Sequence, residues 1–361
     1  MVEIADIFRL HGPEYRSQFR DRMPPSHLRT MDAIEHCRTE ALGGQLYFCD
    51  QCKEPHYSYH SCKNRHCPKC QNDQANEWLD NQKDLLLPVG YFMVTFTLPE
   101  GLRSVARSHQ QVIYTSLFRA SSEALLELAS DPRFVGGKIG AVGVLHTWTR
   151  DLFYHPHVHY IATGGGLCAD GQWRTSRQNF LVHVKPLSIL FRAKFRDLLK
   201  QTDLFQLLDQ QVWSQAWVVH SQPVGSGSAS FKYLAPYIFR VAINNRRILA
   251  LEDGRVTFSY KDSATDQTRF STVSAEEFIR RFLQHVLPKG FVKVRYYGLL
   301  SAANRHLLDQ ARQLLNTAAA QSISLNADRQ QKDPLDPPRC PKCGQILRLL
   351  ERLKPTTRWP P

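Results

Sequence analysis

The sequence predicts an α+β fold, in which a cysteine-rich N-terminal module precedes a domain with a largely antiparallel sheet flanked by helices. Two observations carry this prediction. Six of the nine cysteines lie within residues 37–70, which is typical of a small metal-bound module. Beyond that module, the expected strands arrive mainly as hairpins separated by helical segments. Hydrophobic residues make up 42% of the chain, which is enough for a buried core.

The length and charge of the chain limit its organisation and its partners. A chain of 361 residues accommodates two or three domains. We expect a zinc-binding module over 1–85, a second domain over 86–310 and a polar, flexible tail over 311–361. The net charge of +13 favours a polyanionic partner, DNA or RNA, over an acidic small molecule. The alternative is a basic protein that has no such partner.

The chain lacks the sequence signals of a membrane or secreted protein. It contains no apolar run of about 18 residues, the length that a membrane helix needs, so we expect no membrane span. Its first residues lack the basic and apolar regions of a signal peptide. We therefore expect a cytoplasmic location, where cysteines stay reduced and clustered cysteines bind metal more often than they form disulfides.

In the first third of the chain, hydrophobic spacing and turn residues predict helices around a single strand. Residues 1–36 have a helical pattern that breaks at Pro24-Pro25. Residues 75–87 are predicted to form a connecting helix. The segment 90–98 is rich in β-branched and aromatic residues, which favour a buried strand. Apolar residues follow at helical spacing over 102–128, so we expect one or two helices there.

The rest of the chain alternates predicted strands and helices. Two strands over 139–149 and 155–163 are joined by a short connection, which predicts a hairpin. Residues 187–199 carry the apolar stripe of an amphipathic helix. The remaining predictions are a short strand over 217–222, a helix from Phe231 that Pro236 bends or breaks, a hairpin of 248–251 with 255–260 around Glu252-Asp253-Gly254, a helix capped by Ser274 and Glu277, and a strand over 291–297.

The cysteine-rich module contains two C-x2-C pairs, Cys49-Cys52 and Cys67-Cys70, with 14 residues between them. Four thiolates at this spacing suit tetrahedral zinc. Other candidate ligands lie close by and could form a second site or replace a ligand: Cys37, Cys62, His60 and His66. Basic residues, Arg65 among them, alternate with these candidates, so the module could also contact a phosphate backbone. A purely structural zinc is the alternative. The remaining pair, Cys340-Cys343, has no evident partner pair, and we assign it no site.

A histidine-rich strand provides the second candidate site. Side chains alternate faces along a strand, so His155, His157 and His159 share one face. Two imidazoles on one face can bind one divalent metal. If residues 149–154 form a hairpin turn, His146 lies across from His157 and His159 and is the natural third ligand, with His155 as second choice. Three ligands leave positions for phosphate oxygens and water. Mg²⁺ or Mn²⁺ suits phosphate chemistry, although imidazoles also accept zinc. The alternative for each residue is an ordinary core histidine.

A pair of tyrosines could supply a nucleophile. Tyr233 and Tyr237 are four residues apart, so on a helix they share a face. A tyrosine hydroxyl has an ordinary pKa near 10 and needs a cation or a base before it can attack. The metal, Lys232 and Arg240 could provide this help. A DNA backbone could also be bound by Arg240, Arg246 and Arg247. An aromatic core pair is the alternative reading of this spacing.

Five motifs occur in a characteristic order: Arg65-His66-Cys67-Pro68-Lys69-Cys70-Gln71, Phe96-Thr97-Leu98-Pro99, Leu145-His146-Thr147-Trp148, His155-Pro156-His157-Val158-His159, and Tyr233-x3-Tyr237 followed by Arg240-Val241-Ala242-Ile243. Over roughly residues 10 to 310 the chain resembles the rolling-circle transposases of the insertion sequence ninety-one type, within the His-hydrophobic-His (HUH) endonuclease superfamily. The resemblance implies an HUH-type domain whose Phe-Thr-Leu strand neighbours the histidine strand. An acidic third metal ligand, familiar in the superfamily, is not obvious, because Glu100 and Asp151 are poor fits.

The resemblance also implies a function. We expect a transposase whose tyrosine attacks a phosphodiester of single-stranded DNA, forming a 5′-phosphotyrosine and releasing a 3′-hydroxyl. The expected partners are single-stranded DNA at the ends of a mobile element and at its target, and host helicase or replication factors, because the chain has no G-x4-G-K-[ST] ATPase motif. It would then be associated with the nucleoid. The alternatives are a replication initiator or relaxase with the same chemistry, and a non-catalytic zinc-dependent DNA-binding protein.

Overall fold

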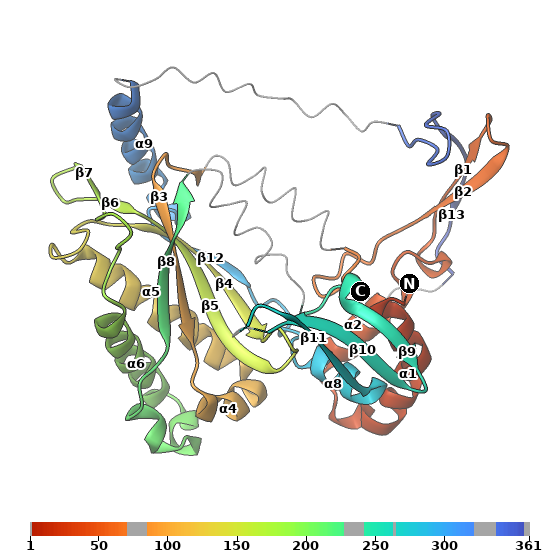
Figure 1. Ribbon diagram of the computed structural model, residues 1–361, viewed down its shortest axis with the longest axis horizontal. Helices are drawn as coiled ribbons and strands as arrows, with labels where there is room; N and C mark the ends of the chain where they lie inside the picture. Colours follow the sequence, from red (N-terminus) through yellow and green to blue (C-terminus); the bar gives the residue numbers. More distant parts are fainter. Residues whose placement is uncertain (1, 71–84, 227–241, 263–264, 321–336, 357–361) are drawn as a thin grey trace.

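A five-stranded antiparallel sheet forms the centre of the larger half of the molecule (Figure 1). The computed structural model describes residues 2–70, 85–226, 242–262, 265–320 and 337–356, with the backbone alone for 317–320. The strand order is β12-β4-β5-β3-β8. The strands are β3 (Gly90–Thr97), β4 (Gly140–Trp148), β5 (Tyr154–Thr163), β8 (Val219–Ser226) and β12 (Val294–Gly298). The predicted hairpin is β4 with β5, and the Phe-Thr-Leu strand is β3, which pairs with β5.

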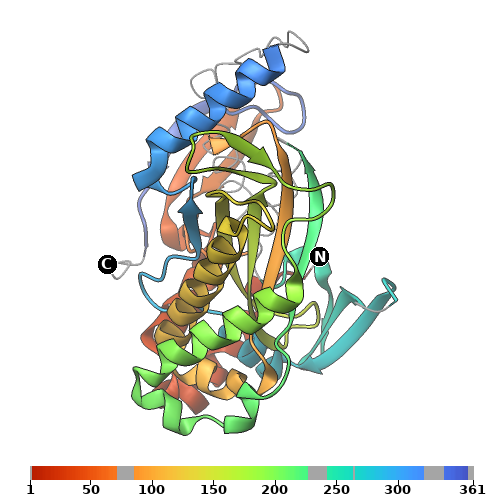
Figure 2. The ribbon, with the colours of Figure 1, turned by 90° about the vertical axis from the view of Figure 1, so that its left-hand side faces the viewer.

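Three helices cover one face of this sheet: α4 (Arg103–Ser108), α5 (Gln110–Ser130) and α6 (Val184–Lys200). The predicted stripe of α6 explains how this helix packs. Leu187, Phe191, Phe195 and Leu199 recur every fourth residue, and all four are fully buried against α5 and the sheet. Figure 2 shows α5 and α6 lying side by side in front of the sheet.

Among the described residues, a helix covers one end of the opposite face of the sheet. Helix α9 (Arg305–Ala320) lies there, at the top of Figure 1, and buries Leu308 and Ala311 against Val142 and Ile161. A two-stranded ribbon, β6 (Gly165–Leu167) with β7 (Trp173–Thr175), flanks this end. The other end of the same face carries the histidines.

A second unit combines the two N-terminal helices with residues 248–283. It contains α1 (Ile4–Phe19), α2 (Pro25–His36), the sheet of β9 (Ile248–Glu252), β10 (Arg255–Lys261) and β11 (Thr268–Ser274), and α8 (Ala275–Leu283). Phe8 and Phe282 meet edge to face in its core, with ring centroids 5.3 Å apart. Within the domain expected over 86–310, the stretch that contains β9 to α8 thus packs with the N-terminal helices. Because α8 is strongly amphipathic, it buries its apolar face, and it does so against α1 rather than against the central sheet.

A third, smaller unit is a three-stranded ribbon in the order β13-β1-β2, formed by β1 (Gly44–Cys49), β2 (Glu54–Tyr59) and β13 (Arg348–Leu353). In Figure 1 it projects at the upper right, where the blue β13 lies beside the orange β1 and β2. The expected flexible tail over 311–361 is therefore wrong for its described parts, because α9 packs on the sheet and β13 pairs with β1.

Most predicted elements are confirmed. The helical break at Pro24 separates α1 from α2, and the Ser274 side chain accepts a hydrogen bond from the Glu277 amide, as a capping residue does. Most of the helix expected over 75–87, and the helix expected from Phe231, lie outside the described residues. Short 3₁₀ turns occupy Arg20–Arg22, Glu40–Leu42, Glu100–Leu102, Asp203–Leu207, Gln210–Trp213, Asn245–Arg247 and Ala302–Asn304. Within the described ranges, no helix combines the length and apolar character that a bilayer crossing needs.

Candidate metal centres

Three histidines meet on the sheet face that also carries α9, at the end away from this helix. His146 on β4 pairs directly with His157 on β5, and His159 lies one step further along the same face of β5. The nearest ring nitrogens of the three side chains all lie within 4.8 Å of one another. This is the arrangement predicted from the hairpin. A single divalent ion could be bound by all three imidazoles, and this ligand set stays a prediction.

The alternation of β5 explains why these side chains point away from the core. Val158 and Tyr160 enter the helix-covered core and are fully buried, while His157 and His159, which alternate with them, are only partly buried. His155 shares their face but stands outside the group, because its Nδ1 accepts a hydrogen bond from Arg103 Nη2 at 2.9 Å. His155, the second choice for the third ligand, therefore bonds to an arginine through its Nδ1 atom.

Hydrogen bonds orient two of the imidazoles. His157 Nδ1 donates to the carbonyl of His155 at 2.7 Å, and His159 Nδ1 lies 2.8 Å from Thr95 Oγ1 on β3. When each Nδ1 carries the proton, Nε2 presents its lone pair to a metal. Burial also lowers the pKa of His157 to about 4. The ring is therefore neutral at pH 7, as a metal ligand must be.

The two acidic residues considered as ligands lie elsewhere. Glu100 faces Arg103, with Oε1 and Nη1 3.4 Å apart, and Asp151 accepts a hydrogen bond from the hydroxyl of Thr149. Within the described part of the chain, no carboxylate belongs to the histidine group. An all-imidazole set is therefore the one that this geometry offers.

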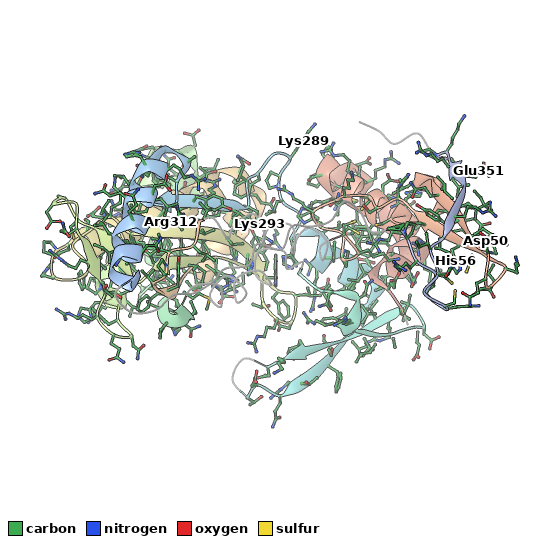
Figure 3. All side chains as sticks on the ribbon, turned by 90° about the horizontal axis from the view of Figure 1, so that it is seen from above. Asp50, His56, Lys289, Lys293, Arg312 and Glu351 are labelled. Carbon is green, nitrogen blue, oxygen red and sulfur yellow. The ribbon has the colours of Figure 1, made fainter. Side chains whose placement is uncertain are left out.

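The sequence reasoning gave no role to three residues near the histidines: His220, Trp148 and Lys293. His220 on β8 pairs with Thr95 and is exposed on the same face as His159. The alternation of the predicted strand over 217–222 could have indicated it. Trp148 stacks on His146 with ring centroids 4.7 Å apart, and the Lys293 ammonium lies 5.2 Å from the Trp148 ring centre. Figure 3 shows Lys293 near the junction of the two larger units.

The arginines predicted to contact DNA differ in exposure and in their hydrogen-bond partners. Arg65 donates to the carbonyls of Pro288, at 2.7 Å, and Phe291, so it joins the cysteine module to the loop before β12. Arg247 donates to the main-chain carbonyls of Ser259 on β10 and of Arg150 in the turn between β4 and β5, whereas Arg246 is exposed. The catalytic candidates Tyr233 and Tyr237, together with Lys232 and Arg240, lie outside the described residues.

Eight cysteines form two separate groups of four. One group is Cys37, Cys62, Cys67 and Cys70. The other is Cys49, Cys52, Cys340 and Cys343. This corrects the expectation that Cys49 and Cys52 share a site with Cys67 and Cys70. The reason is the β1–β2 hairpin: Cys49 stands at its turn, whereas Cys62 follows the far end of β2, about 20 Å away for strands of six residues.

The two remaining zinc candidates in this module do not join either group. The amide of His60 donates to the carbonyl of Gly43. The Nε2 atom of His66 accepts a hydrogen bond from the amide of Leu287 at 3.3 Å, and burial lowers the pKa of His66 well below its ordinary value. His66 therefore helps Arg65 to connect the cysteine module with the loop before β12.

Comparison with known proteins finds two family matches along the chain. Residues 7–98 match the family described as "Transposase zinc-binding domain", and residues 140–307 match the family described as "Putative transposase". The protein "Putative transposase y4qJ" of Sinorhizobium fredii is 39% identical over 371 aligned residues, which cover 95% of this chain and 93% of the relative.

The chain belongs to the transposase family of the insertion sequence ninety-one type.

The "Transposase for insertion sequence element IS801" of Pseudomonas savastanoi pv. phaseolicola is 29% identical over 299 residues, covering 77% of this chain and 70% of that protein. A transposase acts on DNA, which accounts for the net charge of +13. The transposase zinc-binding domain and the two cysteine groups together support bound zinc.

Proposed function

We propose that this transposase cuts and rejoins single-stranded DNA through a covalent tyrosine–phosphate bond. The observation that carries the proposal is the meeting of His146, His157 and His159 on one sheet face. These residues would hold a Mg²⁺ or Mn²⁺ ion, and such an ion supplies charge stabilisation at a phosphate oxygen. The resemblance to HUH endonucleases assigns the nucleophile to Tyr233 or Tyr237.

The reaction conserves the phosphodiester energy. The tyrosine oxygen forms a bond to phosphorus as the bond from phosphorus to the 3′ oxygen breaks, and the tyrosine proton is transferred so that the leaving oxygen ends as a hydroxyl. The DNA then carries a 5′-phosphotyrosine. Attack by another 3′-hydroxyl reverses the step and joins a new strand without ATP. Two tyrosines allow two strands to be held in turn.

Chain connectivity supports this assignment. Ala242 follows Tyr237 by five residues, a length that spans at most about 18 Å. Ala242 lines a small cavity together with Trp148, and Trp148 stacks on His146. Ala242, the first described residue after the two tyrosines, therefore lies close to the histidine face. On the same face, the exposed His220 offers a group that could contact a phosphate backbone.

A nicking assay on labelled single-stranded DNA tests the proposal. Wild-type protein with Mn²⁺ should give a covalent protein–DNA adduct, and mass spectrometry should place the nucleotide on a peptide that contains residues 231–240. Tyr233→Phe and Tyr237→Phe should each retain an adduct, and only the double variant should lose it, because Phe keeps the ring and removes the attacking oxygen. Tyr57→Phe, on the distant ribbon, is the matched control.

The same assay distinguishes the alternatives. An adduct on any other residue, or an adduct in the double variant, refutes the two-tyrosine mechanism. DNA binding with no nicking under any divalent metal would instead support a non-catalytic zinc-dependent DNA-binding protein. A replication initiator or relaxase would form the same adduct, and only an assay of strand transfer into a second DNA separates it from a transposase.

A further inference from the structure

The pair Cys340-Cys343 completes a four-sulfur group with Cys49 and Cys52. The Sγ atoms of Cys49 and Cys343 lie 3.5 Å apart, and those of Cys52 and Cys340 lie 3.9 Å apart. Tetrahedral zinc with Zn–S bonds of about 2.3 Å places its sulfur ligands about 3.8 Å apart. A disulfide would need about 2.05 Å. The spacing therefore fits four ligands around one ion.

The two C-x2-C pairs of this group have the same backbone conformation, although Cys52 and Cys340 lie 288 residues apart in the sequence. The Lys53 amide donates to the Cys49 carbonyl at 2.8 Å, and the Gly344 amide donates to the Cys340 carbonyl at 2.8 Å. Lys53 and Gly344 both have positive φ, 56° and 77°. Each C-x2-C pair is thus followed by the same left-handed turn, which folds both cysteines of the pair towards one point.

Pairing of β13 with β1 brings the halves together. The register runs from Gly44 opposite Leu353 to Phe48 opposite Arg348. Two ion pairs cross the same junction: Lys342 Nζ lies 2.6 Å from a carboxylate oxygen of Glu54, and Arg348 lies 3.1 Å from Asp50. Figure 3 shows Asp50, His56 and Glu351 gathered at this end of the molecule.

These contacts alone provide little stability. Five of the six β13 side chains are exposed, and among the described residues the core beside them has Cys49, Cys340 and Leu347 as its buried members. The ion pairs are solvent-exposed, and such pairs contribute about 0 to 1 kcal/mol each. A unit this small normally needs a metal or a disulfide to fold. The sulfur spacing excludes the disulfide, so a metal remains.

We propose that Cys49, Cys52, Cys340 and Cys343 bind a second zinc ion, which fastens residues 337–353 to the β1–β2 hairpin. The chain then contains two structural zinc ions. Cys37, Cys62, Cys67 and Cys70 hold the first, with Sγ separations of 3.5 Å and 3.6 Å around Cys70. The family match to the zinc-binding domain ends at residue 98, so half of the second site comes from outside it.

Zinc content of the full-length protein tests this inference. Wild-type protein should contain two zinc ions per chain, and Cys340→Ser/Cys343→Ser should contain one. Cys168→Ser is the matched control, because Cys168 is buried and belongs to neither group, and it should keep two. One zinc in the wild-type protein, or two in the double variant, overturns the proposal.

Alkylation of the unmodified protein keeps the test independent of whether the variant folds. Cys343 is exposed, so only a bound metal can protect its thiol from a small alkylating reagent. Mass spectrometry should find Cys340 and Cys343 unmodified in the zinc-loaded protein, and a chelator should make them reactive together with Cys49 and Cys52. Rapid alkylation of Cys343 while Cys49 and Cys52 stay protected would refute the shared site.

Discussion

The hydrogen bond between Thr95 and His159 offers a sharp test of the histidine centre. Thr95 Oγ1 lies 2.8 Å from His159 Nδ1, on the strand next to β5. When His159 binds a metal through Nε2, its Nδ1 carries the proton and donates a hydrogen bond to Thr95 Oγ1. Thr95→Val keeps the shape of the side chain and removes the acceptor. Loss of such an orienting partner typically weakens metal binding about 10- to 100-fold, or about 1.4 to 2.7 kcal/mol.

Titration of zinc-loaded protein with Mn²⁺, followed by calorimetry, measures this change directly. Thr95→Val should bind Mn²⁺ about 10- to 100-fold more weakly, and nicking should recover when the Mn²⁺ concentration is raised. Thr97→Val is the matched control, because Thr97 lies two residues further on the same face of β3 and pairs with His157. An unchanged Mn²⁺ affinity in Thr95→Val, or an equal loss in Thr97→Val, would refute the proposed role of this hydrogen bond.

Three further predictions follow from the same geometry. His157→Ala or His159→Ala should abolish nicking and leave zinc content and folding intact, and full nicking in either variant or in excess EDTA would contradict the site. Cys67→Ser should cost one zinc per chain and unfold the module, measured by elemental analysis and limited proteolysis; an unchanged zinc content would contradict the cluster. His285 follows α8 and is buried, with its ring between Thr147 Oγ1 and the Leu152 carbonyl. Burial lowers its pKa to about 3, so the ring is neutral in the fold and takes up a proton on unfolding below its ordinary pKa of about 6.5. Stability should therefore fall as the pH drops from about 6.5 towards 3, and in urea melts His285→Asn should reduce the slope by up to about 1.4 kcal/mol per pH unit; an unchanged slope would refute this.

The central sheet and its histidines could be predicted because their signals are local. The two-residue period of β5 places His157 and His159 on one face, and the hairpin turn places His146 opposite them. The stripe on α6 likewise indicated a buried helix, and the structure confirms it. In each case a few neighbouring residues determine both the element and the direction of its side chains.

Elements whose partners lie far away in the sequence could not be predicted in this way. The amphipathic pattern of α8 indicates that one face is buried, but it does not identify α1 as the partner. The pair Cys340-Cys343 has the spacing of zinc ligands, yet its partners lie 288 and 294 residues earlier. The segment around it is polar, because a zinc ion and not an apolar core would hold it in place.

Hydrogen bonds and strand pairing connect the first cysteine group, Cys37, Cys62, Cys67 and Cys70, to the histidine face. Arg65 and His66 directly precede Cys67, so the fold of that knuckle fixes their positions. Both bond to the loop over 287–291, which leads into β12. Strand β12 pairs with β4, and β4 carries His146. The cysteine module therefore supports the strand that presents one of the three imidazoles, and zinc bound there would stabilise the histidine centre even if no cysteine or neighbouring basic residue touched DNA.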